Sequence, residues 1–313
     1  MLLRSPFVAL IAASAAWGLG TVVSKAALET FPPLILLPIQ LAASLVGLAL
    51  LMRWRGVPLR ASVDPVLARL GLLNPGLSYA LSLVGLTMIS ASLSVLLWVV
   101  EPLLIVGLAV AILHEPLRPL VVPMSALAAL GMVLLVLEPG LAGDTLGIAL
   151  TLAGVLCCAV YTIVARRRLG DADTPNVVVA QQAHALVLAI GLAVAAVGLG
   201  GAAMPTAIPP EALAAAIGSG LLYYGAAYWL YLSALARLPA ITASASFYLI
   251  PLFGLAGAFV LLDESLAPVQ WVGAVLVVGS VAVLLRSGSA EPVSRPSSAR
   301  PAEAASAGSP PPA

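Results

Sequence analysis

The chain has 313 residues, of which 62% are hydrophobic and only 9% are charged, whereas about 25% of the residues of an average soluble domain are charged. Charges this sparse cannot cover a surface that faces water, so the composition excludes a soluble globular protein and indicates a membrane protein. The 14 basic and 13 acidic residues nearly cancel to a formal net charge of +1, and this balance argues against nucleic-acid binding.

Ten apolar runs follow one another along the chain, separated by charged residues or by clusters of Pro and Gly. Each has about the 20 residues that a helix needs to cross a bilayer core of roughly 30 Å. They lack the alternating pattern of a membrane barrel, so we predict an all-α, polytopic membrane protein. In chain order the ten predicted transmembrane helices cover residues 6–28, 34–52, 66–86, 90–112, 119–137, 145–166, 175–197, 211–234, 240–262 and 267–285.

The arginines predict the orientation of these helices. If the N-terminus is cytoplasmic, every arginine falls on the inner side, while the outer connections carry acidic residues but no lysine or arginine. This is the distribution that the positive-inside rule requires, so we predict that both termini lie in the cytoplasm. Residues 287–313 are mainly Ser, Pro, Ala and Gly, and we predict a disordered cytoplasmic tail.

The chain contains an internal repeat. Residues 72–122 align without gaps with residues 221–271 at an offset of 149, with 15 identities in 51 positions. Further upstream, at an offset of 141, Trp17 faces Cys158 and Lys25 faces Arg166. We therefore predict two related five-helix repeats, 1–142 and 143–286. Because five is odd, the second repeat is inverted, and inverted repeats can open alternately to the two sides of a membrane around a midplane site.

Three sequence features are the Trp17-Gly18 to Lys25 spacing, a Pro 13 residues before a Glu in both repeats (Pro102 to Glu115, Pro251 to Glu264), and the run Glu264, Gln270, Gly273 and Gly279. Together they resemble the ten-helix EamA branch of the drug/metabolite transporter superfamily, over residues 6–286. The resemblance implies a bacterial inner-membrane exporter of small metabolites, and the exporters of aromatic and neutral amino acids look most similar. One departure is that Val121 and Met124 stand where the second repeat has Gln270 and Gly273.

Glu101 lies in the middle of the fourth predicted helix, where a carboxylate costs about 2.5–3.5 kcal/mol to insert. At helical spacing it shares a face with Ser94 and Trp98, so a hydroxyl, an aromatic ring and an acid point to the same region. One interpretation is a contact for a substrate ammonium group or a proton carrier. The other is a protonated acid that donates to the carbonyl freed by Pro102.

Aromatic residues recur on faces of several predicted helices. Tyr79 and Ser82 align with Tyr228 and Tyr231, and Pro75 and Tyr224 extend the two faces. An interfacial aromatic belt is the usual explanation of membrane tyrosines, but these lie well inside their segments, which favours an aromatic pocket. The predicted substrate-binding residues are Trp17, Tyr79, Ser82, Ser94, Trp98, Glu101, Tyr161, Tyr224, Tyr228, Ser244 and Tyr248.

Other polar or special residues have two interpretations each. Lys25 ends the stripe of Ser14, Trp17 and Thr21, and it either contacts a substrate or gate or extends to the lipid headgroups. Asn74, Gln182 and His184 are possible substrate or gate contacts, or they bond neighbouring helices. Pro102 and Pro251 are predicted helix bends that act as gates, or packing kinks. Glu115 and Glu264 are interpreted as residues at helix starts.

No motif of an intramembrane enzyme occurs, and no Gly-rich phosphate loop supports an ATP-driven pump. Cys157 and Cys158 lack a metal-ligand spacing, so we predict neither a metal nor a cofactor. The predicted function is secondary transport by alternating access, and the rival is a passive facilitator or channel for small amphipathic solutes. The expected partners are a small-molecule substrate and the lipid bilayer, with a monomer as one possible state.

Overall fold

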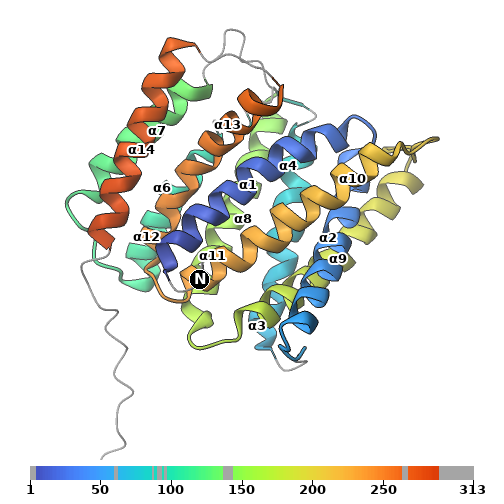
Figure 1. The fold of residues 1–313 in the computed structure, drawn as a ribbon, viewed down its shortest axis with the longest axis horizontal. Coiled ribbons are helices and arrows are strands. Elements are labelled where there is room, and N and C mark those ends of the chain that lie inside the picture. The colour runs from blue at the N-terminus through green and yellow to red at the C-terminus, as the bar shows by residue number, and fades with distance from the viewer. Residues whose placement is uncertain are drawn as a thin grey trace, which may run out of the picture.

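The computed structural model describes residues 5–59, 63–86, 88–89, 94, 97–136, 144–262 and 267–288. Its regular elements are all helical, which confirms the all-α prediction for these residues (Figure 1). They are α1 (Pro6–Leu28), α2 (Pro33–Trp54), α3 (Pro65–Gly71), η1 (Leu72–Leu77), α4 (Ser78–Leu86), α6 (Val100–Leu108), η2 (Ala109–Leu113), α7 (Val121–Val136), α8 (Thr145–Leu169), α9 (Thr174–Gly198), α10 (Pro210–Ser219), η3 (Gly220–Ala226), α11 (Ala227–Leu235), α12 (Ala240–Ser244), η4 (Ala245–Leu249), α13 (Ile250–Leu262) and α14 (Pro268–Gly288).

Six described helices are long and apolar enough to cross a membrane: α1, α2, α8, α9, the continuous unit Pro210–Leu235, and Pro268–Ser287. Shorter apolar helices run through Val100–Leu113, Val121–Leu135 and Ala240–Gly254. The chain is therefore a multi-pass membrane protein. The fourth predicted helix, 90–112, lies partly outside the described residues, as do Glu264 and most of the predicted tail.

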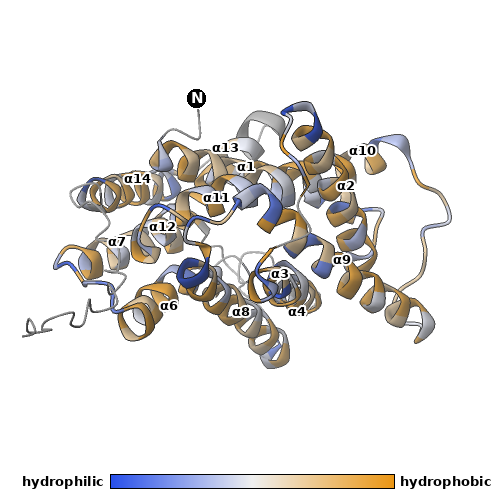
Figure 2. Ribbon diagram, turned by 90° about the horizontal axis from the view of Figure 1, so that it is seen from below, coloured by the Kyte–Doolittle hydropathy of each residue, from blue (hydrophilic) through white to orange (hydrophobic). Residues whose placement is uncertain are grey.

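The first helix of each half packs mainly against helices of the other half, an arrangement that we call the exchanged packing. α1 packs against α10, η3, α11 and α13, whereas α8 packs against α3, η1, α4 and α6. Two further pairs, α7 with α14 and α2 with α9, join the halves on opposite sides of the bundle, as Figures 1 and 2 show. The centre of the bundle is therefore built from helices of both halves.

Two helices are interrupted at corresponding places. η1 and η3 are short π-helical segments, and the repeat offset of 149 places Leu72 opposite Leu221. In η1 the interruption follows from Pro75, which has no N–H to donate, and Asn74 adopts an extended conformation (φ −146°, ψ 122°). Both segments lie next to the centre of the bundle, where an irregular backbone exposes groups that side chains can bind.

A glycine at the start of each interruption is in close contact with the other half: Gly71 directly precedes η1, and Gly220 is the first residue of η3. A Cβ on Gly71 would lie 1.8 Å from the carbonyl oxygen of Gln181, and a Cβ on Gly220 would lie 2.4 Å from that of Gln40. No side chain fits at these distances, so only glycine lets the helices approach this closely. The two glutamines are themselves related by the offset of 141, so one packing device occurs twice.

The segments that join α2 to α3 and η2 to α7 contact the helix ends beside the segments that join α8 to α9 and α11 to α12. Asn176 donates from Nδ2 to the Pro58 carbonyl at 3.1 Å, and Arg168 Nη1 lies 3.6 Å from Asp64 Oδ2. Glu115 accepts from the Ala240 N–H at 2.8 Å. These contacts place the four segments at one end of the bundle, which we call the linked end.

Candidate functional site

The predicted aromatic residues form a continuous path of ring contacts through the centre of the bundle. Trp98 stacks on Tyr79 with centroids 6.1 Å apart, and Tyr79 meets Tyr224 edge-on at 5.6 Å. Tyr224 stacks on Tyr228 at 6.2 Å, and Tyr228 meets Trp17 at 5.5 Å. These distances lie in the favourable range for aromatic pairs. The path, which we call the aromatic cluster, joins residues of both halves.

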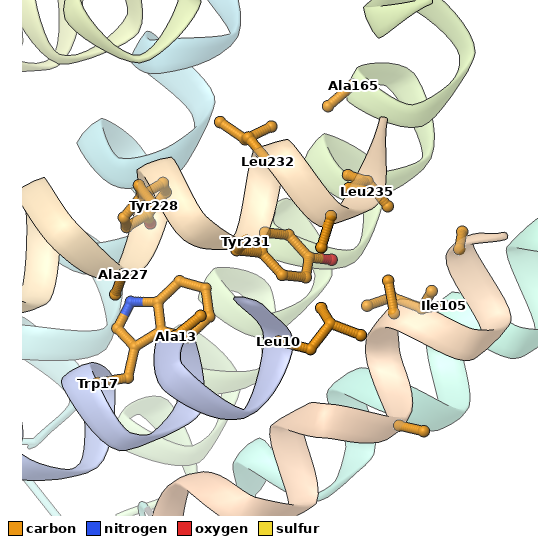
Figure 3. Packing of buried hydrophobic residues seen from close by; sticks show 14 of the residues in the cluster. Leu10, Ala13, Trp17, Ile105, Ala165, Ala227, Tyr228, Tyr231, Leu232 and Leu235 are labelled. Carbon is orange, nitrogen blue, oxygen red and sulfur yellow. The ribbon is translucent and has the colours of Figure 1, made fainter. Parts of the chain in front are cut away.

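Trp17 is a junction of the aromatic cluster. Besides Tyr228, its ring contacts Tyr231 at 5.4 Å and Phe247 at 5.6 Å, and Tyr231 and Phe247 are 4.9 Å apart. Figure 3 shows Trp17 of α1 facing Tyr228 and Tyr231 of α11. Tyr161 joins the cluster through Tyr228 at 6.4 Å. The rings contact one another directly, so the aromatic side chains pack together at the predicted site.

Hydrogen bonds hold the phenolic groups in place. Asn74 Oδ1 accepts from the Tyr228 hydroxyl at 2.8 Å and from Ser78 Oγ at 2.8 Å. The Tyr161 hydroxyl donates to Gln181 Oε1 at 2.9 Å. Asn74 was predicted as a possible substrate or gate contact, and in this structure its carbonyl oxygen positions a cluster residue. Such bonds orient rings that packing alone would leave free to rotate.

Three polar groups near the cluster lack partners among the described residues. Glu101 lies in the first turn of α6 and is 9% exposed, and none of those residues donates to its carboxylate. Trp17 Nε1 and Ser82 Oγ are buried and also without a partner in the described part. Buried polar groups are nearly always hydrogen-bonded. The Glu101 carboxylate can therefore accept a further hydrogen bond, and Trp17 Nε1 and Ser82 Oγ can each donate one.

Glu101 is close to the aromatic cluster. It lies within electrostatic range of Tyr223, Tyr231 and Cys158. In the alternative interpretation, a protonated Glu101 donates to the backbone carbonyl that Pro102 leaves free, the carbonyl of Trp98. The described residues include no such hydrogen bond. A contact between Glu101 and a substrate stays a prediction.

Three aromatic residues of the cluster, Tyr223, Tyr231 and Phe247, were not in the predicted substrate-binding set, and neither was the neighbouring Cys158. No sequence motif marks Tyr223, yet its hydroxyl accepts a hydrogen bond from the Tyr79 hydroxyl at 3.0 Å. Phe247 aligns with Trp98 at the offset of 149, and Cys158 aligns with Trp17 at the offset of 141. Cys158 is buried within range of Tyr79, Tyr224 and other cluster tyrosines. Applying the repeat alignment to each predicted aromatic residue would have found Phe247 and Cys158.

Two predicted polar residues have structural partners instead. Gln182 donates from Nε2 to the Tyr224 carbonyl and accepts from Ser44 Oγ, so both ends of its amide join helices. His184 Nδ1 lies 2.8 Å from the Ala180 carbonyl of its own helix, and no described ring contact links it to the aromatic cluster. The Gln182 bonds match the interpretation that it joins neighbouring helices, whereas the His184 contact lies within α9 itself, and a substrate contact of either residue stays a prediction.

The remaining predicted residues lie around the cluster or away from it. Ser94 and Tyr248 are buried, and Ser244 is buried with its hydroxyl bonded to the Ile241 carbonyl at 3.0 Å. Lys25 is exposed in the last turn of α1, as the headgroup interpretation requires. Pro102 lies within α6 and Pro251 within α13, and their roles as gates stay predictions.

Glu115 links the two halves at the linked end. Its carboxylate accepts from the N–H groups of Ala240 at 2.8 Å and Ile241 at 3.0 Å, and its Oε1 lies 3.9 Å from Arg166 Nε. Glu115 therefore sits at a helix start as predicted, but the helix is α12 of the other half. The predicted helix 119–137 begins in the structure at Val121, as α7.

Comparisons with known proteins agree with this architecture. The model of the EamA-like transporter family matches residues 4–137 and again residues 145–286. A protein of known crystal structure, 19% identical in sequence, has a TM-score of 0.76 and covers 91% of this chain and 98% of its own, so it shares the fold. No curated protein matches the sequence significantly. Because two matches cover both halves of the helical bundle, the chain belongs to the EamA-like transporter family.

Proposed function

We propose that this family member is a secondary transporter that exports small metabolites, with aromatic and neutral amino acids as the substrate class. The observation that carries the proposal is the buried carboxylate of Glu101 beside the aromatic cluster, to which no described residue donates a hydrogen bond. A buried acid suits an ammonium group, and the unbonded donors Trp17 Nε1 and Ser82 Oγ suit a carboxylate. Aromatic walls suit an apolar or aromatic side chain. Together these groups match the three parts of an amino acid.

Alternating access follows from the architecture that we propose. The chain has ten transmembrane helices, arranged as a repeat at 1–142 and an inverted repeat at 143–286, with the residues from 287 on as a cytoplasmic tail. The exchanged packing of α1 and α8 supports two equivalent halves that rock about the aromatic cluster. The linked end, which carries Arg166, Arg167 and Arg168, is the cytoplasmic end in a bacterial inner membrane.

Glu115 has a role in this cycle. Its contacts with Ala240, Ile241 and Arg166 tie the segment after η2 to the start of α12 in the other half. Opening of the linked end separates these segments, so the Glu115 contacts belong to the state in which this end is closed. A closed linked end supports alternating access over a permanently open pore.

Orientation is tested by labelling the two ends of α8. The variants D144C and R168C place a thiol beside each end of this helix, which runs Thr145–Leu169. A reagent that does not cross the membrane is expected to label position 144 in intact cells and position 168 only after permeabilisation. Labelling of both positions from the same side would overturn the proposed topology.

Transport is tested with purified protein in liposomes. Wild type is expected to show saturable amino-acid flux that is accelerated by substrate on the opposite side, whereas a facilitator or channel shows no such exchange. Glu101→Gln removes the charge but keeps the shape, so we expect flux to fall roughly tenfold to 100-fold, the value of a hydrogen bond to a charged group. Its pH dependence should also disappear across roughly pH 5.5–8.5.

The matched control is Glu29→Gln, which changes an exposed acid at the end of α1. We expect its flux to equal that of the wild type. If Glu101→Gln transports as well as the control at every pH, Glu101 is a structural acid and the facilitator becomes the favoured function. If wild-type protein transports none of the amino acids tested, the proposed substrate class is wrong.

A further inference from the structure

A groove of about 190 Å³ lies towards the linked end, and no residue of the aromatic cluster lines it. It runs between α3, α6 with η2, and α8, and its walls include Val66, Leu108, Ile112 and Val160. Val66, Ile112 and Val160 are 39%, 45% and 36% exposed, so this is an outward-facing surface. In a multi-pass membrane protein an outward-facing apolar groove is in contact with lipid acyl chains.

Two arginines border the same groove. Arg167 and Arg168 lie in the last turn of α8 and are both exposed. Because α8 has 25 residues, more than the roughly 20 needed to span the bilayer core, its last turn lies at the headgroup level. The groove therefore combines apolar walls at acyl-chain depth with guanidinium groups at phosphate depth.

The charges at the groove do not cancel. Arg168 Nη1 lies 3.6 Å from Asp64 Oδ2, so one of the two arginines has an acidic neighbour. Asp64 is held there because its Oδ1 accepts from the Val66 N–H at 2.8 Å. No described residue forms an ion pair with Arg167. Arg167, Arg168 and Asp64 leave one net positive charge, which complements a headgroup with one net negative charge.

We propose that this groove is a binding site for one anionic phospholipid, with an acyl chain along Val66, Ile112 and Val160 and the headgroup phosphate at Arg167 and Arg168. Arginine suits this role because its planar group can donate two parallel bonds to a phosphate. The groove contacts α3, η2 and α8, which belong to both halves and meet at the linked end. A lipid bound there holds these helices together, independently of the transported substrate.

The test uses the full-length protein in detergent, with lipid retention measured by native mass spectrometry. Wild type is expected to retain one phosphatidylglycerol at concentrations where phosphatidylcholine is not retained. In R167Q/R168Q we expect phosphatidylglycerol affinity to fall roughly 25-fold, since each arginine near a membrane surface contributes about fivefold. The matched control is R53Q/R286Q, which removes two exposed arginines of α2 and α14 and leaves the groove unchanged.

Two further measurements separate a lipid site from a simple anion site. Val160→Trp fills the groove without a change of charge, so we expect it to weaken phosphatidylglycerol retention while leaving the melting temperature in phosphatidylcholine unchanged. Glycerol phosphate, which has the charge but no acyl chains, should not displace the lipid. An equal loss of affinity in R53Q/R286Q, full retention in Val160→Trp, or displacement by glycerol phosphate would each overturn the proposal.

Discussion

The two halves of the protein share their backbone architecture but differ in the side chains at the centre. Each half has a glycine that touches a glutamine backbone of the other half, Gly71 with Gln181 and Gly220 with Gln40. Each glycine leads into a π-helical segment at the same place in the repeat. The devices that set the helix positions therefore occur twice.

The side chains at the aromatic cluster do not follow this symmetry. Trp17 corresponds to Cys158, and Glu101 corresponds to Ile250. Ser82, whose hydroxyl is unpartnered, corresponds to Tyr231, whose hydroxyl lies 3.3 Å from Thr162 Oγ1. The repeat thus keeps the residues that hold the helices and varies those beside the proposed substrate. The comparison predicts symmetric effects on folding and asymmetric effects on transport.

The largest expected effect tests the symmetric part. The added Cβ would lie 1.8 Å from a backbone oxygen in Gly71→Val and 2.4 Å from one in Gly220→Val. A backbone cannot move aside as a side chain can. We expect each variant to lose about 3 kcal/mol or more of stability and most of its folded yield, measured by size-exclusion chromatography and thermal unfolding.

The control for the glycine variants is Gly107→Ala in α6, where no atom lies within 4 Å of the added Cβ. It should fold as well as the wild type. If only one of Gly71→Val and Gly220→Val loses its fold, the two contacts are not equivalent and the symmetry of the halves is broken at this level.

The second prediction tests the asymmetric part. The double variant E101Q/I250E moves the carboxylate to the position that the repeat makes equivalent. Because the residues around Ile250 differ from those around Glu101, flux in liposomes should stay more than roughly tenfold below wild type. The single variant I250E is the control, and it should retain flux if it folds. Recovery of flux in the double variant would mean that the two positions serve the substrate equally.

The third prediction compares repeat-related tyrosines. Tyr228→Phe removes a buried hydrogen bond to Asn74 Oδ1. Among the described residues, Ser78 then remains as the one donor to this oxygen. Tyr79→Phe removes a bond to the part-buried Tyr223 hydroxyl. We expect losses of about 1.5 and 0.5 kcal/mol in thermal unfolding, in that order. The reverse order would show that the Tyr79 side of the cluster is the more constrained.

A smaller effect than that of Tyr228→Phe is expected at the linked end. Glu115→Gln keeps one acceptor but loses the charge and one of the two bonds to the start of α12, so stability should fall by about 1 kcal/mol. Arg166→Gln should lose less, because the Arg166 Nε and Glu115 Oε1 atoms are 3.9 Å apart. Thermal unfolding in detergent measures both, and an equal loss would assign the stability to the ion pair.

Sequence patterns predicted the helices well because the membrane sets their lengths. The predicted segments 6–28 and 145–166 become α1, Pro6–Leu28, and α8, Thr145–Leu169. The π-helical segments escaped prediction, because an apolar run has the same hydropathy whether or not its hydrogen bonds are regular. Pro75 is the one local signal of an interruption, and η3 has no proline.

The candidate site was predictable only in part, for a different reason. The polar and aromatic stripes identified Trp17, Tyr79 and Tyr228, because such residues are rare inside membrane helices. The partners that hold them depend on which helices of the two halves meet, and one segment does not reveal this. The bond from Glu115 to the start of α12 connects residues 125 positions apart in the chain. Its detection required the three-dimensional packing.

The exchanged packing of α1 and α8 has a consequence for how the protein is made. The partners of α1 include α11, which ends at Leu235, roughly 200 residues after α1 leaves the ribosome. At a synthesis rate of about 5–20 residues per second, α1 waits on the order of 10–40 s for them. During this interval the indole of Trp17 faces lipid or the insertion machinery. The first half is thus a nascent chain that cannot mature until translation is nearly complete.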